Sequence, residues 1–376
     1  MHLLKSQPGG FVDEEGIIDL DQSPADIIIL SAADSSLGAL THAAENLSAN
    51  FPSIRLANWL QLLKPAAFDL YRHKVLDHAK VVVVSLLGGS SYWQYGVEQL
   101  EDWLKGSRPK RPRQLIIVSG DDSADPELTE LSSLDEESVQ RVWRYLREGG
   151  VPNAQQLFQF LAAECLQRDV QWQEPQPLPH CLLYQPDSPY AQATFTEWQA
   201  RWEREIHSAQ TVCILLFYRS HLQSANTQMF ADLIKVLEAQ GLQPLPIAIA
   251  SLKDPESLAL VNALIEQSDA KLILNTTGFA SNRVSAPDLS AEPTEFHSPF
   301  ARDIPVFQLI LSGSTAEDWQ QYSQGLRSRD IAMQVVLPEM DGRIITRALS
   351  FKAESRYSER CEISVIQYQL QTERAQ

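Results

Sequence analysis

Short, continuous apolar runs alternate along this chain with longer segments whose apolar residues recur at helical spacing. An uninterrupted apolar run is typical of a parallel strand that is buried on both faces of its sheet. In the first half, the strands that we expect lie within residues 26–31, 53–57, 80–87 and 113–119. The helical spacing returns between and after them, most clearly in residues 92–106 and 138–150.

The second half shows the same alternation. It predicts strands within residues 211–218, 242–250, 271–276 and 304–312, with helices at 225–240, 255–268 and 315–325. Asp254 and Pro255 are a plausible N-cap and first residue of the middle helix. Near the end, two strand-like runs, MQVVL and IITRALSF, flank the turn-like segment PEMDGR, in which Asp-Gly is a hairpin signal.

Alternating strands and helices predict the α/β class, here as two doubly wound, mostly parallel, Rossmann-like lobes. Prolines cluster between residues 171 and 189, where they disfavour a regular element throughout. We therefore expect one lobe over residues 1–175 and another over 176–376. The second lobe includes a long polar loop near residues 281–303.

Charge and composition narrow the functional classes. The chain has 376 residues, a net charge of -17 and a pI near 4.9, so nucleic acid is not expected as a partner. The one basic run, RPKRPR at residues 108–113, is predicted to be a solvated loop. Neither a signal peptide nor an apolar run of about 18 residues is found, so no membrane segment is expected. The four cysteines lack CxxC spacing, which suits a reducing cytoplasm.

One candidate site follows the strand at residues 211–218. In doubly wound sheets ligands bind beyond the carboxyl ends of the strands, and Arg219, Ser220 and His221 lie at such an end. Arginine is suited to fork-like binding of carboxylates or phosphates, and histidine can act as acid, base or ligand. The alternative is a loop held by hydrogen bonds to its own backbone.

The equivalent position of the first half reads LLGGSSYW. Gly88 and Gly89 permit close backbone approach, and Tyr92 and Trp93 could cover a flat apolar ligand. The segment is neither GxGxxG nor a P-loop, and a tight turn with two core aromatics is the alternative. The turn SGDD at residues 119–122 could bind a cation, although an ordinary strand-end turn explains it as well. The loops LNTTGF and LSGS are further polar strand ends.

Several long stretches resemble one family. Five segments resemble the large subunits of aerobic cobaltochelatase and occur in the order found there. They are MHLLKSQPGGF, DLYRHKVLDHAKVVVVSLLGGSSYWQYGVEQL, WRYLREGGVPNAQQLFQFL, LLFYRSHLQSANTQMFADLIKVLEAQGLQPLPIAIASLKDP and LPEMDGRIITRALSFK. More distantly, they are similar to the H subunits of magnesium chelatase. The resemblance covers nearly the whole chain.

This resemblance implies a part in an ATP-dependent chelatase that inserts cobalt, its substrate ion, into hydrogenobyrinic acid a,c-diamide during cobalamin synthesis. AAA+ and integrin-like partner subunits would use the ATP, which agrees with the missing P-loop. Family members are several times longer, so the resemblance implies an N-terminal portion leading toward a larger body and inactive by itself. No catalytic residue or cobalt ligand can be carried over to this chain.

Within this resemblance, Arg219 could pair with a carboxylate of the macrocycle, with Ser220 and His221 donating hydrogen bonds. Tyr92 or Trp93 could lie against the ring. Three alternatives stay open: a non-catalytic interaction module surviving as a truncated paralogue, a magnesium chelatase large subunit and, on fold grounds only, a small-ligand sensor.

Overall fold

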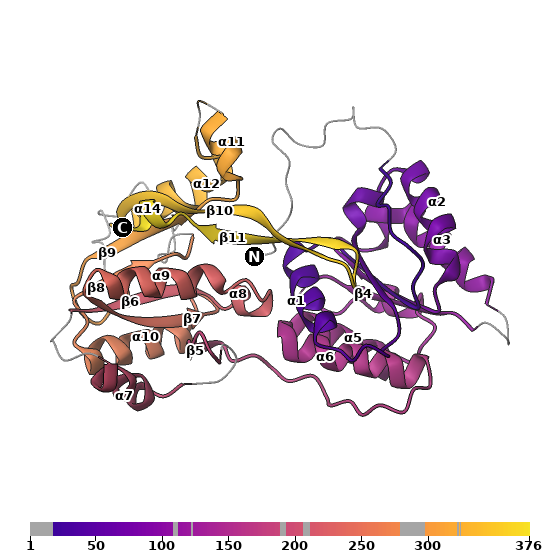
Figure 1. Ribbon diagram of the computed structural model, residues 1–376, viewed down its shortest axis with the longest axis horizontal. Helices are drawn as coiled ribbons and strands as arrows, with labels where there is room; N and C mark the ends of the chain where they lie inside the picture. Colours follow the sequence, from indigo (N-terminus) through magenta and orange to yellow (C-terminus); the bar gives the residue numbers. More distant parts are fainter. Residues whose placement is uncertain are drawn as a thin grey trace, which may run out of the picture. The chain divides into compact units, whose positions relative to one another are not determined.

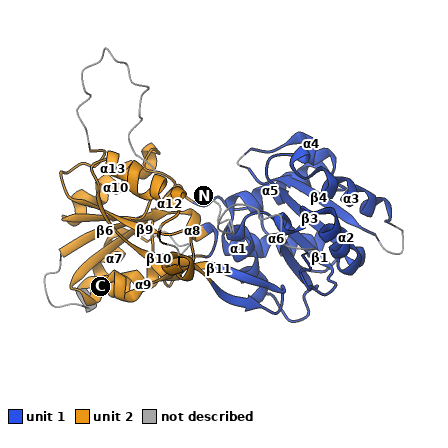
Figure 2. Ribbon diagram, turned by 90° about the horizontal axis from the view of Figure 1, so that it is seen from above, with its two compact units in different colours: residues 1–178, 223–225, 354–366 blue, residues 179–222, 226–353, 367–376 orange. Residues whose placement is uncertain are grey.

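The computed structural model describes residues 18–107, 112–121, 123–188, 193–205, 211–278, 298–321, 323 and 325–376. The chain forms two compact units, which Figure 2 shows in blue and orange. Unit 1 comprises Met1–Leu178, Gln223–Ala225 and Glu354–Ile366. Unit 2 comprises Pro179–Leu222, Asn226–Ala353 and Gln367–Gln376. Each unit therefore contains segments that are far apart in the sequence.

Unit 1 is built on a four-stranded sheet in which every strand pair is parallel. Its strands, in the order β2-β1-β3-β4 across the sheet, are Ile54–Asn58, Ile27–Ser31, Val81–Leu86 and Gln114–Ser119. The strand order reverses between β1 and β3, because β1 leads to β2 on one side and β3 leads to β4 on the other. A crevice at the carboxyl ends of β1 and β3 is the usual ligand position in such a sheet.

Both faces of this sheet are covered, because successive side chains of a strand point to opposite faces. Ile27 and Ile29 of β1 belong to a core shared with the helices α1, α5 and α6. Ile28 and Leu30 belong to a second core, shared with α2, α3 and α4. Figure 1 shows α2 and α3 on one side of this sheet and α5 and α6 on the other. These helices are α1 (Asp34–Glu45), α2 (Pro65–Lys74), α3 (Gln94–Lys105), α4 (Pro126–Glu130), α5 (Glu136–Glu148) and α6 (Gly150–Phe160). The 3-10 turns are η1 (Trp59–Leu62), η2 (Leu76–His78) and η3 (Ser90–Trp93), and α6 continues into the π-helical η4 (Leu161–Cys165).

A seven-stranded sheet in the order β11-β10-β9-β8-β6-β7-β5 forms the centre of unit 2. The inner strands are parallel to one another, whereas β5 runs antiparallel to β7 at one edge. The strands are β5 (Cys181–Leu183), β6 (Thr211–Tyr218), β7 (Leu242–Ile249), β8 (Leu272–Asn275), β9 (Val306–Leu311), β10 (Ile344–Ser358) and β11 (Ile363–Leu370). The ends of β10 and β11 nearest their connecting turn belong to unit 1.

Helices accompany the strands of unit 2. They are α7 (Phe195–Glu205), α8 (Ser220–Gln223), α9 (Gln228–Ala239), α10 (Pro255–Ser268), α11 (Ala316–Gln321), α12 (Ser328–Ile331), α13 (Leu337–Met340) and α14 (Thr372–Ala375), with the π-helical turn η5 (Ala332–Val336) between α12 and α13. Asp254 caps α10, since its carboxylate accepts from the Ser257 N–H at 3.0 Å, and Pro255 is the first helical residue. This prediction is confirmed.

The α/β class is confirmed, with parallel strands at the centre of both sheets. That both units are Rossmann-like lobes stays a prediction. The expected strand at MQVVL is wrong, because these residues form η5 and the first residue of α13. Here Gln334 donates to the Leu311 carbonyl at 2.6 Å and accepts from the Leu311 N–H at 2.8 Å. The chain segment beside β9 is thus held by a side chain and is not paired as a strand.

PEMDGR consequently does not join two strands. Its first residues belong to α13, and Gly342, with φ 69°, lies in the turn that leads into β10. Most of the expected loop at 281–303 lies outside the described residues. No helix among the described residues combines the length and apolar character that crossing a membrane requires.

Candidate functional site

Arg219 lies at the carboxyl edge of the unit 2 sheet. It follows β6, whose central residues are buried, and its backbone N–H donates to the Ile249 carbonyl at the end of β7, 2.8 Å away. Its Nη1 donates to the Pro179 carbonyl at 3.2 Å. The side chain is half-buried. Arg219 therefore joins two strand ends to the segment that enters β5, with its guanidinium at the edge where a ligand would bind.

Ser220 and His221 open the short helix α8, and both are half-buried. The His221 ring packs against aromatic rings of the same unit: its centroid lies 4.8 Å from that of Phe230 and 5.7 Å from that of Tyr368. Burial lowers the pKa of His221 well below the ordinary value, because a charged imidazolium is poorly solvated among these rings. His221 is thus a neutral, packed side chain at pH 7.

The segment after β3 places its four predicted residues in different environments. Gly88 and Gly89 have φ values of +80° and +75°, which favour glycine. Tyr92 is 56% exposed, whereas Trp93 is 2% exposed and stacks on Trp59 with centroids 5.1 Å apart. A flat ligand can reach the Tyr92 ring but not the Trp93 ring.

The predicted residues fall in two groups. Arg219, Ser220 and His221 are brought together in unit 2, and residues 88–93 in unit 1. Within each group the residues are neighbours in sequence as well as in space. The first group combines a strand-edge guanidinium with a packed histidine, and the second combines an exposed tyrosine with a core tryptophan.

A buried polar network in unit 2 was missed from the sequence. Arg343 Nη2 lies 2.9 Å from Asp341 Oδ2, and the side chains of this ion pair are 3% and 2% exposed. Arg343 Nη1 also donates to Gln308 Oε1 at 3.0 Å, and Gln308 accepts from Asn275 Nδ2 at 2.7 Å. Burial lowers the pKa of Arg343, but the guanidinium remains charged.

This network joins the carboxyl end of β8 and the middle of β9 to the start of β10. Thr277 completes it, because its carbonyl accepts from both Gln308 Nε2 and Arg343 Nη1. Tyr218 extends it toward β6: its hydroxyl donates to the Gly278 carbonyl at 2.8 Å, and burial raises the pKa of Tyr218 to about 12. Two features of the sequence could have indicated this network. One is the pair of opposite charges two positions apart in MDGR, and the other is the polar loop LNTTGF.

A second polar strand end lies after β9, at LSGS. The carboxylate of Asp330 on α12 accepts from the Ser312 hydroxyl at 3.1 Å and from the Gly313 N–H at 2.9 Å. Gly313 has little room for a side chain, since a Cβ there would meet Asp330 Oδ1 at 3.2 Å. This strand-end loop is therefore filled by a carboxylate of its own unit.

The turn SGDD ends β4 in unit 1. Asp121 is exposed, and its N–H donates to Ser119 Oγ at 3.1 Å, which is the hydrogen bonding of a strand-end turn. Asp122 lies outside the described residues. The described part of the chain contains no group of three or more His, Cys, Asp or Glu side chains placed to hold a metal ion.

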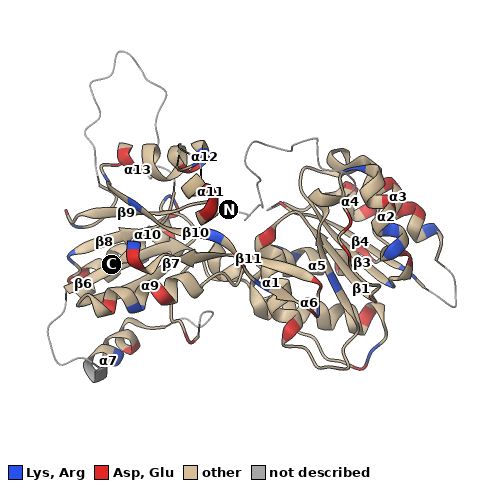
Figure 3. Cartoon of the chain, turned by 45° about the horizontal axis from the view of Figure 1, so that its top comes forward, with Lys and Arg blue, Asp and Glu red and all other residues tan. Residues whose placement is uncertain are grey.

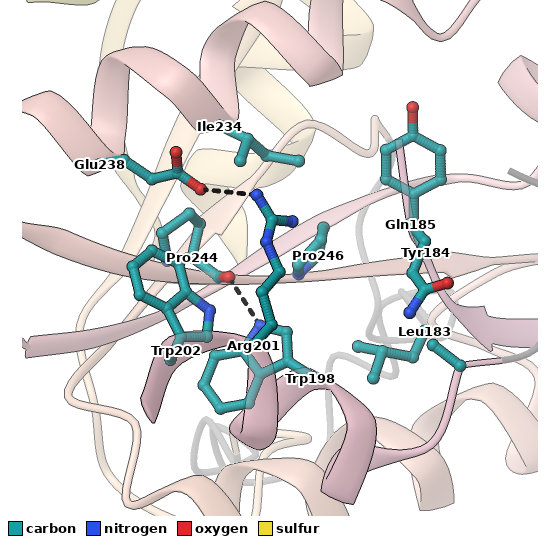
Figure 4. Close-up of a pocket in the computed structure, with 11 residues that line it drawn as sticks. Leu183, Tyr184, Gln185, Trp198, Arg201, Trp202, Ile234, Glu238, Pro244 and Pro246 are labelled. Carbon is teal, nitrogen blue, oxygen red and sulfur yellow. Dashed lines mark hydrogen bonds and ion pairs between the residues drawn. The ribbon is translucent and has the colours of Figure 1, made fainter. Parts of the chain in front are cut away.

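A small pocket of unit 2 lies between α7, α9 and β7 (Figure 4). Trp198 Nε1 donates to the Pro244 carbonyl at 3.0 Å, and Arg201 Nη2 lies 3.6 Å from Glu238 Oε1. The indole Nε1 of Trp202 is buried without a hydrogen-bond partner. The pocket has a volume of about 20 Å³, which suits about one water molecule and is far too small for a macrocycle.

Charged side chains are mixed rather than sorted by sign on the helices of unit 1. Figure 3 shows basic and acidic positions close together on α2 and α3. Lys105 Nζ, for example, lies 2.9 Å from Asp102 Oδ1. Such mixing differs from the continuous basic face of a typical duplex binder.

The chain resembles known proteins over its whole length. It is 48% identical over 374 residues to the aerobic cobaltochelatase subunit CobN of Pseudomonas aeruginosa, covering 100% of this chain and 28% of that protein. It is 38% identical over 371 residues to the same subunit of a Sinorhizobium species, covering 97% and 28%. The chain therefore spans little more than a quarter of the length of these relatives.

A solved structure agrees with the sequence relatives. The catalytic subunit of cobaltochelatase from Mycobacterium tuberculosis superposes with a TM-score of 0.66 at 26% identity, covering 93% of this chain and 26% of that one. The family model CobN/Magnesium Chelatase matches residues 143–376, which is more than half of the chain. The chain thus belongs to the CobN/magnesium chelatase family.

Proposed function

We propose that this chain is the N-terminal region of a cobaltochelatase large subunit and contributes to binding the tetrapyrrole into which cobalt is inserted. The observation that carries the proposal is the 48% identity to a cobaltochelatase subunit along the whole chain. Both sequence relatives named above are cobaltochelatase subunits, which supports cobalt over magnesium. Cobalt is then a substrate ion, not a resident cofactor.

The remaining tasks of a chelatase would fall to other subunits and to residues beyond this portion. AAA+ and integrin-like partner subunits would use the ATP, since the chain has no P-loop sequence. The assembly would work in the cytoplasm. Metal insertion would need residues beyond this portion, and the chain alone would be inactive. Its own contribution would be recognition of the macrocycle and attachment to the assembly.

We propose one recognition residue in each unit, Arg219 in unit 2 and Tyr92 in unit 1, each acting within its own unit. A corrin precursor carries carboxylates around a flat ring, and a guanidinium at a strand edge can bind one of them through two hydrogen bonds. The Tyr92 ring is exposed and can stack on a flat surface. Trp93 and His221 would support these two residues from the core, because both are packed against other aromatic rings.

A titration of the purified chain with hydrogenobyrinic acid a,c-diamide tests this proposal. Binding would quench the fluorescence of some of the eight tryptophans. We expect saturable quenching that Arg219→Ala weakens about tenfold or more, as for the loss of a charge-assisted hydrogen bond. Arg201→Ala is the matched control, because Arg201 lies in the same unit and pairs with Glu238.

Two results would count against the proposal. If the folded chain shows no saturable quenching, tetrapyrrole recognition does not reside in this portion. If both arginine variants weaken binding equally, the effect comes from net charge and not from the position of Arg219. Circular dichroism of each variant confirms that the fold is intact.

An interaction module is the second candidate function, and one surface favours it. Among the described residues, six large hydrophobic side chains are exposed, and four of them lie close together in sequence, at Ile331, Val336, Met340 and Ile344. Val336 follows Ile331 through the π-helical turn η5, and Met340 follows one helical turn later. This spacing repeats an apolar side chain once per turn, as on a helix face that contacts another polypeptide.

Size-exclusion chromatography with the purified AAA+ and integrin-like subunits tests this second function. We expect Val336→Asp with Met340→Asp to abolish co-elution, because two charges would be buried in the contact. Tyr357→Asp, another exposed hydrophobic position, should have no effect. Unchanged co-elution of the double variant would exclude this surface.

A further inference from the structure

A cavity of about 50 Å³ lies at the carboxyl edge of the unit 1 sheet. Its lining residues come from the ends of β1, β3 and β4 and from α1 and α5, and they include Ser31, Ser36, Ser85, Ser119, Asp121 and Arg147. Ser31 and Ser85 are direct register partners on the neighbouring strands β1 and β3. The cavity therefore occupies the point where the strand order reverses, the usual ligand position of a doubly wound sheet.

Two of the serines that line this cavity, Ser31 and Ser119, are buried, and each hydroxyl has a proton that it can donate. Ser31 is 2% exposed, and its Oγ accepts from the Ala33 N–H at 3.2 Å. Ser119 is 8% exposed, and its Oγ accepts from the Asp121 N–H at 3.1 Å. A hydroxyl carries one donor besides its acceptor sites, and no acceptor for either proton is found among the described residues. Buried donors are normally satisfied, so both hydroxyls are suited to donate to an oxygen atom of a ligand in the cavity.

The charges around the cavity define that ligand further. Arg147 adds donors, with Nη1 3.6 Å from Glu148 Oε1, and Asp121 adds a carboxylate that can only accept. An anion would be repelled by the Asp121 carboxylate, and a cation by Arg147. A neutral group that both accepts and donates suits all of them.

We propose that unit 1 binds a primary carboxamide group in this cavity. The carbonyl oxygen accepts from the Ser31 and Ser119 hydroxyls and from Arg147, and the amide nitrogen donates to Asp121. A planar group of this kind fits the cavity volume, whereas a macrocycle does not. This site stands independently of the proposed recognition by Arg219 and Tyr92.

Titrations of the isotope-labelled chain with acetamide and with acetate, followed by amide NMR shifts, test the proposal. Acetamide is expected to give saturable shifts at Ser31, Gly120 and Arg147, with a dissociation constant on the order of 1–10 mM for so small a ligand. Acetate has the same shape but a negative charge, so it should bind about tenfold more weakly. Asp121→Asn removes the repulsion and should narrow this difference.

Variants of the donors complete the test. Ser119→Ala and Arg147→Gln should each weaken acetamide binding about fivefold, as for one lost hydrogen bond. Ser35→Ala is the control, because Ser35 adjoins the cavity residue Ser36 without lining the cavity. Arg147 is partly exposed, so its variant reports on binding even if Ser119→Ala perturbs the fold. Shifts that do not saturate, or acetate binding as tight as acetamide binding, would overturn the proposal.

Discussion

Asp341 and Arg343 form a buried ion pair two residues apart, with 2.9 Å between Oδ2 and Nη2. The pair lies where the chain leaves α13 and enters β10, and Arg343 also donates to the Gln308 side chain in the middle of β9. The long strand β10 therefore begins at a fixed charge contact. This contact sets the register of β10 against β9, in which Ile344 pairs with Phe307.

Asp341→Asn should strongly destabilise the protein. The variant leaves the Arg343 guanidinium buried without a countercharge, and removing one partner of a buried pair costs about 3–5 kcal/mol. Urea unfolding followed by circular dichroism measures the change in the free energy of unfolding.

Asp102→Asn is the matched control for this prediction. Asp102 pairs with Lys105 on the surface, where both side chains are more than half exposed, so the change should be hardly measurable. Equal effects of the two variants would show that the buried pair contributes nothing special. Replacing both Asp341 and Arg343 by apolar residues should recover part of the lost stability.

A second prediction concerns acid stability. In unit 1, Arg55 Nη2 lies 2.5 Å from Glu362 Oε1, and the Ser23 N–H donates to Glu362 Oε2 at 2.6 Å. Burial raises the pKa of Glu362, but hydrogen bonds from Ser23 and the Arg55 charge outweigh it, so the net pKa is lowered. Because the folded-state pKa lies below the unfolded one, the carboxylate stabilises the protein above about pH 4.3. That contribution is lost as the pH falls through the folded-state value.

Glu362→Gln should therefore destabilise the protein at pH 7 by about 1–2 kcal/mol, discounted for the partial exposure of the pair. At pH 3 the variant and the natural chain should differ much less, since the carboxylate is then increasingly protonated. Urea unfolding at the two pH values measures both differences. A difference that stays constant with pH would show that Glu362 acts through packing and not through its charge.

The sequence predicted those elements whose pattern is fixed by burial on both sides. The strands at Ile27–Ser31, Val81–Leu86 and Thr211–Tyr218 each contain a continuous apolar run, and the structure buries most of their residues. The cap at Asp254 was equally local, because a carboxylate three residues before the Ser257 N–H is sufficient to form it.

Elements that depend on distant contacts escaped this reasoning. MQVVL has the β-branched composition of a strand, but Gln334 binds the backbone of Leu311, 23 residues away, and the segment is helical. Asp341 and Arg343 look like turn residues until β8 and β9 enclose them. Likewise, no sequence signal separates exposed Tyr92 from buried Trp93, because Trp59 and Phe68 come from other segments.

A third prediction separates these two aromatic neighbours. Trp93→Ala should cost about 3–5 kcal/mol, because it opens a cavity beside Trp59 and Phe68 in the core. Tyr92→Ala should cost less than about 1 kcal/mol, since the ring is exposed and contacts Trp59 only edge-on. Thermal unfolding of both variants gives the comparison. Similar losses for the two would contradict the assignment of Trp93 alone to the core.

The last prediction concerns His221 and mild acid. Burial lowers the folded-state pKa of His221 below its unfolded value of about 6.5, so the unfolded chain binds a proton that the folded chain excludes. Stability is then fully present above pH 6.5 and declines as the pH falls toward the folded-state pKa. One such proton lowers the free energy of unfolding by about 1 kcal/mol between pH 7 and pH 5.5.

His221→Phe keeps a ring against Phe230 and Tyr368 but cannot take up a proton. Relative to the natural chain, this variant should lose about 1 kcal/mol less stability between pH 7 and pH 5.5. If His221→Phe instead follows the natural chain over this range, His221 accepts its proton in the folded state. It would then be available as an acid or hydrogen-bond donor at the edge of the sheet.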